Sequence, residues 1–155
     1  MAITDQCDEI QAFLTDQART YLARALNGEL SYKAIGFAVG RGGYNPTDPV
    51  KVLPISGSEI DLSDQVYPDV VGESPFQQID TPGATSTVVF NCRLSSTTNP
   101  SNSDYGLGEL GLFAEILHSN DPLEVGKVFL FALSHFPIKA KTKRDTILFR
   151  VTVQF

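Results

Sequence analysis

Apolar residues in the first part of the chain recur every three or four positions, which is the spacing of one face of an α-helix. Thr4 or Asp5 can cap the start of such a helix, and Asn27-Gly28 provides its end. The pattern therefore predicts one amphipathic helix over residues 1–28. Its apolar face consists of Ile10, Phe13, Leu14, Ala18, Tyr21, Leu22, Ala25 and Leu26.

This apolar face has two possible uses. It can pack against the sheet of its own chain, which is the commoner use of such a face. It can also join identical subunits, and we predict self-association because a small domain has limited room to bury two aromatic side chains on one helix. The residues assigned to this subunit contact are Ile10, Phe13, Leu14, Tyr21 and Leu22.

After Gly28 the pattern becomes that of β-strands. Apolar and polar residues alternate over 87–94 and 147–155, which predicts strands with one buried and one wetter face. Residues 126–136 are apolar on both faces and predict a central, covered strand. Shorter strand-like runs occur at 32–40 and 50–56.

Loops rich in proline, glycine and polar residues separate these runs at 41–49, 56–83 and 95–104. The predicted fold class is mainly β with one N-terminal α-helix, as an antiparallel sheet or β-sandwich covered by the helix. We expect one structural domain, in which the helix occupies residues 1–28 and the β part occupies residues 29–155.

Composition narrows the class of protein. The chain has 155 residues, of which 42% are hydrophobic and 19% charged, as in a globular domain. Its net charge of -6 argues against nucleic-acid binding, which favours basic surfaces. Two cysteines, Cys7 and Cys92, are too few for a disulfide framework or a zinc site. Without a leader-like start or a long apolar run, we expect no membrane insertion.

Three glycines, Gly106, Gly108 and Gly111, have the G-x-G-x-x-G spacing of a dinucleotide-binding turn. That turn needs a strand before it and a helix that opens at its third glycine. Here the preceding residues 95–104 have loop composition, and the run that follows reaches an Asn-Asp-Pro breaker after about ten residues. We therefore predict no nucleotide, and interpret the glycines as points of close approach in a β protein.

Other chemical motifs are incomplete. The histidines His118 and His135 lack a clear third metal ligand, and Ser134 and His135 point to opposite faces of a strand. The segment 40–46 lacks the Lys-Ser/Thr pair of a phosphate-binding loop. We expect no metal, no cofactor and no enzymatic activity. The basic run 139–145 predicts a charged hairpin tip, or alternatively a contact for an acidic partner.

The order of motifs resembles the N-terminal baseplate-attachment domain of tail-fibre proteins from contractile-tailed bacteriophages. The residues that carry the resemblance are "IGFAVGRGGYNPT" at 35–47, "ELGLF" at 109–113, the strand at 126–141 and the closing strand at 146–155. In that family the closing strand leads into a receptor-binding shaft, whereas this sequence stops at Phe155. The resemblance therefore implies a free-standing baseplate or fibre-adaptor subunit.

The function expected from this resemblance is structural. We expect a virion protein that assembles in the host cytoplasm, forms a homo-oligomer, with a trimer favoured, and docks fibres or neighbouring baseplate proteins. The alternative is a β-sandwich carbohydrate-binding module for receptor recognition, although the absence of tryptophan weakens it. Aromatic and arginine side chains on Pro-stiffened loops predict the partner contacts. These residues are Arg41, Tyr44, Asn45, Pro46, Tyr67 and Phe76.

Overall fold

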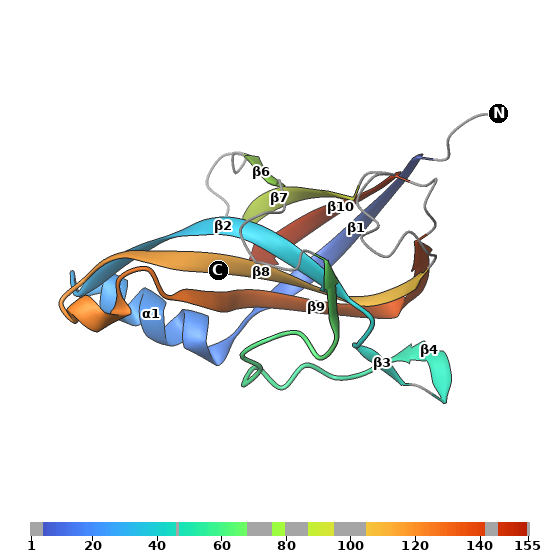
Figure 1. The fold of residues 1–155 in the computed structure, drawn as a ribbon, viewed down its shortest axis with the longest axis horizontal. Coiled ribbons are helices and arrows are strands. Elements are labelled where there is room, and N and C mark those ends of the chain that lie inside the picture. The colour runs from blue at the N-terminus through green and yellow to red at the C-terminus, as the bar shows by residue number, and fades with distance from the viewer. Residues whose placement is uncertain are drawn as a thin grey trace.

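Ten strands and one α-helix make up the part of the chain that the computed structural model describes, which is residues 5–45, 47–67, 76–79, 87–94, 105–141 and 146–154 (Figure 1). The predicted class, mainly β with one α-helix, is confirmed. In chain order the elements are β1 (Asp5–Leu14), α1 (Asp16–Leu26), β2 (Leu30–Gly40), β3 (Tyr44–Asn45), β4 (Asp48–Val52), β5 (Gln65–Tyr67), β6 (Phe76–Ile79), β7 (Thr87–Leu94), β8 (Tyr105–Ser119), the 3-10 turn η1 (Pro122–Glu124), β9 (Val128–Lys141) and β10 (Thr146–Gln154).

Eight of these strands form one sheet in the order β5-β2-β8-β9-β1-β10-β7-β6. Most neighbours are antiparallel, but β1 and β10 run parallel, with Asp5 opposite Thr146 and Ala12 opposite Val153. The prediction of a purely antiparallel sheet is therefore wrong. The reason is topological, because the first and last described strands lie side by side and point the same way.

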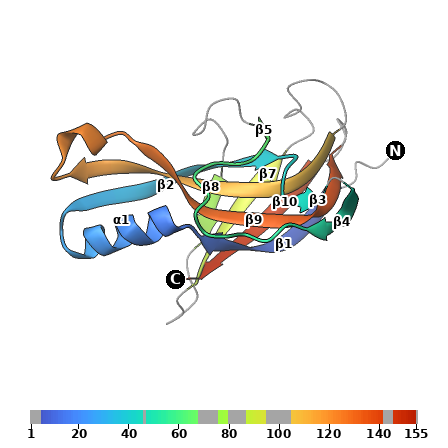
Figure 2. The same ribbon diagram turned by 90° about the horizontal axis from the view of Figure 1, so that it is seen from below.

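The sheet curls back on itself at β1. Residues 5–12 of β1 pair with β10, whereas Phe13 and Leu14 pair with β9. Figure 2 shows the result, with β1 beside β9 and with β10 and β7 crossing behind β8 and β9. One continuous hydrogen-bonded sheet thus supplies both walls, and two separate sheets of a β-sandwich are not what the described residues form.

The main core lies inside this curl. The Phe131 ring of β9 lies 6.0 Å from Phe90 of β7, and Phe136 lies 5.5 Å from Phe149 of β10, between ring centroids. The predicted alternation is confirmed in β10, where Ile147, Phe149, Val151 and Val153 are all fully buried. The inward residues of β10 therefore pack against β9 and close the core on that side.

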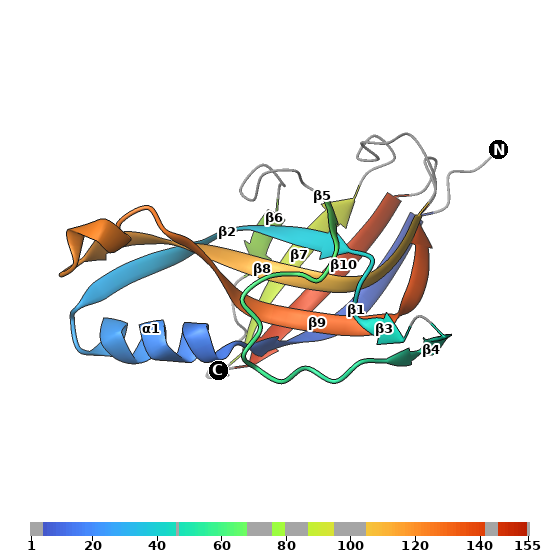
Figure 3. The same ribbon diagram turned by 60° about the horizontal axis from the view of Figure 1, so that its bottom comes forward.

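Strand β9 is covered on both faces, as its apolar sequence predicts. Phe129, Leu130, Phe131, Ala132 and Leu133 are all buried in succession. On the outer face, Leu130 and Leu133 join a second apolar cluster that includes Leu62. Residues 53–64, which we call the strap, bring Leu62 there and run along the outside of β9 (Figure 3).

The N-terminal helix is shorter than predicted. Residues 5–14 form strand β1, so Ile10, Phe13 and Leu14 are not on a helix. The helix begins at Asp16 because Thr15 caps it: the Thr15 hydroxyl accepts from the Ala18 N–H at 3.1 Å. The same hydroxyl donates to the carbonyl oxygen of Leu130 at 2.7 Å, which fixes the start of the helix against β9.

The apolar face of α1 packs against its own sheet. Ala18 and Tyr21 are buried, and the Tyr21 ring lies 4.6 Å from the Phe129 ring. The Tyr21 hydroxyl also accepts from Lys127 Nζ at 2.9 Å. Tyr21, which the sequence assigns to a contact between subunits, thus packs its ring within the chain. Leu22 is 37% exposed.

The far end of the β8–β9 hairpin is tied to this helix. Arg24 donates from Nη1 and Nη2 to the two carboxylate oxygens of Glu124 at 2.8 and 2.7 Å. This pair holds the pKa of Glu124 below its usual range. The turn η1 is thus held in place, while Leu123 on it is 92% exposed.

Candidate partner-binding surface

The three glycines of the nucleotide-like spacing all lie within strand β8, which runs without a break from Tyr105 to Ser119. A phosphate-binding turn needs a strand that ends and a helix that begins at these glycines, and the described residues do not have that geometry. Instead, each glycine meets a neighbour. A Cβ at Gly108 would overlap the Gly42 carbonyl oxygen and the Tyr44 ring.

Next to Gly108, the side chain of Glu109 is fully buried. One carboxylate oxygen, Oε1, accepts from the backbone N–H groups of Asp64 at 2.8 Å and Gly42 at 3.3 Å. The other oxygen, Oε2, accepts from the N–H of Ser63 at 3.0 Å. Three backbone donors satisfy this buried group, as burial of a carboxylate requires. Glu109 thereby joins the 40–45 loop to the end of the strap.

The glycines of the 40–43 segment make room for this carboxylate. A Cβ at Gly40 would overlap Glu109 Oε1, and one at Gly42 would lie 2.9 Å from both carboxylate oxygens. Gly43 has a φ of +88°, a conformation that side chains disfavour. The "GRGG" run therefore makes room for a side chain of its own chain, Glu109.

The structure separates the predicted partner residues of the 41–49 loop. Arg41 is exposed and lies 3.9 Å from Asp64 in a loose surface ion pair. Tyr44 is half-buried with its ring against Gly108, so part of the ring packs within the chain. Asn45 accepts from the Thr47 N–H at 3.0 Å and so stabilises the turn itself. Arg41 is thus the candidate that stays available to a partner.

The remaining predicted partner residues belong to later segments. Tyr67 is half-buried in β5 with its ring 6.4 Å from that of Phe37, so it contributes to the chain's own packing. Pro46 and the side chain of Phe76 lie outside the described residues. Within the 56–83 excursion, residues 56–64 belong to the strap, Gln65–Tyr67 form β5 and Phe76–Ile79 form β6.

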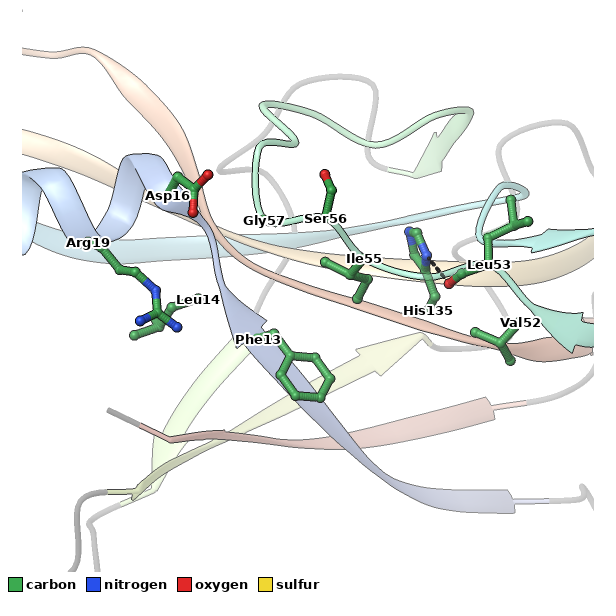
Figure 4. Close-up of a pocket in the computed structure, with 10 residues that line it drawn as sticks. All are labelled: Phe13, Leu14, Asp16, Arg19, Val52, Leu53, Ile55, Ser56, Gly57 and His135. Carbon is green, nitrogen blue, oxygen red and sulfur yellow. Dashed lines mark hydrogen bonds between the residues drawn. The ribbon is translucent and has the colours of Figure 1, made fainter.

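Exposed apolar side chains gather instead at a groove beside the strap. The groove has a volume of about 540 Å³ and lies between β1, the start of α1 and the strap (Figure 4). Phe13 is 53% exposed on one side of it, and Val52 and Leu53 are 38% and 41% exposed on the other. Large exposed apolar groups around one depression are typical of a protein-binding surface. We call this depression the strap groove.

Polar groups complete the strap groove. His135 Nδ1 lies 3.0 Å from the carbonyl oxygen of Leu53, and this hydrogen bond holds the strap against β9. At the helix end, the Asp16 N–H donates to the carbonyl oxygen of Gly57 at 2.7 Å. Arg19 lines the same end. The wall formed by the strap is therefore fixed at both ends before any partner binds.

Sequence reasoning found the groove incompletely. The sequence pattern predicts Phe13 in a contact between identical subunits, and on a helix rather than on β1. It predicts a strand-like run at 50–56 and assigns no contact to Val52 or Leu53. The sequence signal is that Leu53 lies next to Val52 and precedes Pro54 and Ile55, so apolar side chains cluster beside a proline that interrupts the strand.

The described metal-ligand candidates, Cys92 and the basic run do not form a common site. Within the described part of the chain, no three His, Cys, Asp or Glu residues lie close enough together to hold a metal ion. Burial raises the pKa of the Cys92 thiol, which faces the core from β7. In the basic run, Lys139 forms an ion pair with Asp8, and residues 142–145 lie outside the described residues.

No family model, no curated protein and no solved structure matches this chain. Among the described residues, no helix has the length and apolar character needed to cross a membrane.

The two loop residues Arg41 and Tyr44 are expected to respond differently to truncation. Arg41→Ala should change the free energy of unfolding by less than about 0.5 kcal/mol, because it removes a loose surface ion pair. Tyr44→Ala should lower it by about 1–2 kcal/mol, because the ring fills the space above Gly108. Chemical denaturation of both variants measures the difference. Equal stabilities would mean that the Tyr44 ring contributes nothing to holding the loop.

Proposed function

We propose that this protein is a structural component of a bacteriophage tail, a baseplate or tail-fibre adaptor subunit that docks neighbouring tail proteins. The observation that carries the proposal is that the two motifs behind the family resemblance form one structural unit. Strand β2 pairs with β8 so that Val39 lies opposite Leu110 and Gly40 opposite Glu109.

This unit extends beyond the strand pair. The Gly-rich loop after β2 wraps the Glu109 carboxylate, so the "GRGGYN" and "ELGLF" segments depend on each other. Two short sequence matches found independently are more informative when their residues meet in this way. The contact between the two segments in this chain supports a relationship to the fibre-attachment family more strongly than either motif alone.

We propose that neighbouring tail proteins dock at the strap groove. It combines exposed Phe13 and Leu53 with walls held by hydrogen bonds to the sheet. Preformed walls reduce the entropy lost on binding, and a central aromatic residue is a frequent source of binding energy. A neighbouring tail protein that inserts an apolar segment between β1 and the strap would bury both side chains.

Particle incorporation tests this proposal. In particles purified from cells that produce the protein, mass spectrometry should find the subunit in a fixed ratio to other tail proteins. Phe13→Ser and Leu53→Ser should each leave the free energy of unfolding within about 1 kcal/mol, since both side chains are substantially exposed. Each should lower incorporation by about tenfold or more, the expected effect of removing an interface anchor.

A matched control is Leu123→Ser, which removes an even more exposed leucine at the opposite end of the sheet. It should leave incorporation unchanged. If Leu123→Ser blocks incorporation while Phe13→Ser does not, the docking surface is the hairpin tip. Absence of the protein from particles, together with specific binding on a glycan array, would favour a carbohydrate-binding module instead.

A further inference from the structure

The end of helix α1 carries an Asn-Gly dipeptide, Asn27-Gly28, and the sequence contains no second one. In such a pair the backbone nitrogen of the glycine can attack the side-chain amide carbon of the asparagine, because glycine has no side chain to hinder the approach. Both residues are exposed, and a Cβ at Gly28 would meet no atom within 4 Å. Water therefore reaches the dipeptide, and neither residue lines the strap groove.

The folded chain holds this dipeptide in a conformation that keeps the reacting atoms apart. The N–H of Gly28 donates to the carbonyl oxygen of Ala25 at 3.0 Å, and the N–H of Glu29 donates to that of Arg24 at 3.0 Å. Together with the φ of +77° at Gly28, these bonds form a Schellman motif, a common end of a helix at glycine. Asn27 has a ψ of 1°, which turns the Gly28 nitrogen toward the Asn27 nitrogen and away from Cβ.

Attack therefore requires the end of the helix to open. The Gly28 nitrogen must rotate about ψ of Asn27 to the side of Cβ before it can approach the amide carbon. That rotation breaks the hydrogen bond from Gly28 to Ala25. The rate of any reaction at this dipeptide thus depends on how often this turn opens.

The tip of the β8–β9 hairpin clamps the chain on both sides of the dipeptide. Before it, Arg24 donates to both carboxylate oxygens of Glu124, and its Nη2 also donates to Asn120 Oδ1 at 3.2 Å. After it, the Asn120 N–H donates to the carbonyl oxygen of Glu29 at 2.8 Å. Arg24 and Glu29 are also the two residues that one Schellman bond joins. The hairpin tip therefore stabilises the closed form of the turn.

We propose that Asn27-Gly28 is a site of spontaneous deamidation, and that the hairpin tip sets its rate by holding the end of α1 closed. In the open turn, the Gly28 nitrogen bonds to Cγ of Asn27 and the Cγ–Nδ2 bond breaks. The proton of the Gly28 nitrogen leaves with Nδ2 as ammonia, and the product is a five-membered succinimide. This inference does not depend on the proposed role in a phage tail.

Water completes the reaction, and no other reactant is required. Hydrolysis of the succinimide between nitrogen and Cγ gives aspartate, whereas hydrolysis between nitrogen and the backbone carbonyl carbon gives isoaspartate. Either product places a carboxylate at the C-terminal end of α1, where the helix dipole disfavours negative charge. Isoaspartate also adds one carbon to the main chain, so the Schellman bonds from Gly28 and Glu29 lose their geometry. The modification is therefore a one-way loosening of this end of the helix.

Timed incubation of the full chain at mildly alkaline pH tests the proposal, with peptide mass spectrometry and ammonia release as readouts. The native protein should form aspartate and isoaspartate at position 27 at least about tenfold more slowly than the same protein in urea, because opening must precede attack. Glu124→Gln should raise the native rate about threefold to tenfold, since it removes the charge that strengthens the bonds from Arg24. Asn120→Ala should act in the same direction and serves if Glu124→Gln fails to fold.

Two controls accompany these variants. Leu123→Ser lies on the same turn, where the leucine side chain is 92% exposed and outside the clamp, so its rate should equal that of the wild type. Asn27→Gln should abolish product at position 27. The proposal is overturned by equal rates in native and unfolded protein, by lack of product at position 27 in both, or by a folded clamp variant that reacts as slowly as the wild type. A rate for Leu123→Ser as high as that of Glu124→Gln would overturn the role of the clamp.

Discussion

Replacing Glu109 by glutamine is expected to lower the free energy of unfolding by about 3 kcal/mol, although the two side chains have nearly the same shape. All three backbone groups that point at this side chain are donors, from Gly42, Ser63 and Asp64. A glutamine amide has one acceptor oxygen, and its NH₂ group would face an N–H group in a fully buried site. Thermal or chemical denaturation measures the loss.

The matched control is Glu115→Gln, on the same strand. Glu115 is half-buried and lies opposite Lys33, so its replacement should change stability by less than about 0.5 kcal/mol. Hydrogen exchange adds a local readout, since the amides of Ser63 and Asp64 should exchange faster in the Glu109 variant. If both glutamine variants are equally stable, the buried carboxylate does not hold the loops.

Gly108→Ala is expected to cost about 3 kcal/mol as well, for a steric reason. The added methyl group would overlap a backbone atom, the Gly42 carbonyl oxygen, and the ring of Tyr44. Relief requires the 41–45 loop to move away from β8, and that movement would stretch the hydrogen bond from Gly42 to Glu109. Denaturation midpoints and the amide spectrum of the loop report the two effects.

Gly106→Ala, two residues earlier in β8, is the control. Its methyl group would meet the end of the Ile138 side chain at 2.6 Å, and this side chain is 43% exposed and free to shift. The cost should therefore be less than about 1 kcal/mol, partly offset by the lower entropy of the unfolded chain. A larger loss for Gly106→Ala than for Gly108→Ala would contradict the contact described between the loop and the strand.

Strand periodicity was readable from the sequence where one face is buried against a core. Alternation in 147–155 placed Phe149 and Val153 correctly, because a period of two has no helical equivalent over that length. The segment before Thr15 was ambiguous. Ile10 and Leu14 fit a helical face, yet Ile10, Ala12 and Leu14 also alternate with the outward Phe13. Pairing with the parallel strand β10 makes this segment a strand rather than a helix. Because β10 is far away in sequence, the local residue pattern carries no information about it.

The candidate surface was less predictable than the fold. Arg41 could be placed on an exposed loop from composition alone, but the burial of Tyr44 depends on Gly108, which is far away in sequence. The strap groove is assembled from β1, β4, the strap and β9. No single segment of the sequence indicates the groove. The exposed apolar side chains come together because the strap is held over β9.

The parallel pairing of β1 with β10 also constrains the order in which the protein can fold during synthesis. Strand β1 leaves the ribosome before its partner, residues 146–154, has been translated. Until then, the inward residues of β1 have no neighbour on one side, and contacts of such long sequence separation form slowly. The nascent chain thus carries an unpaired, partly apolar strand edge while residues 15–145 are translated, which makes this stage the one most exposed to aggregation.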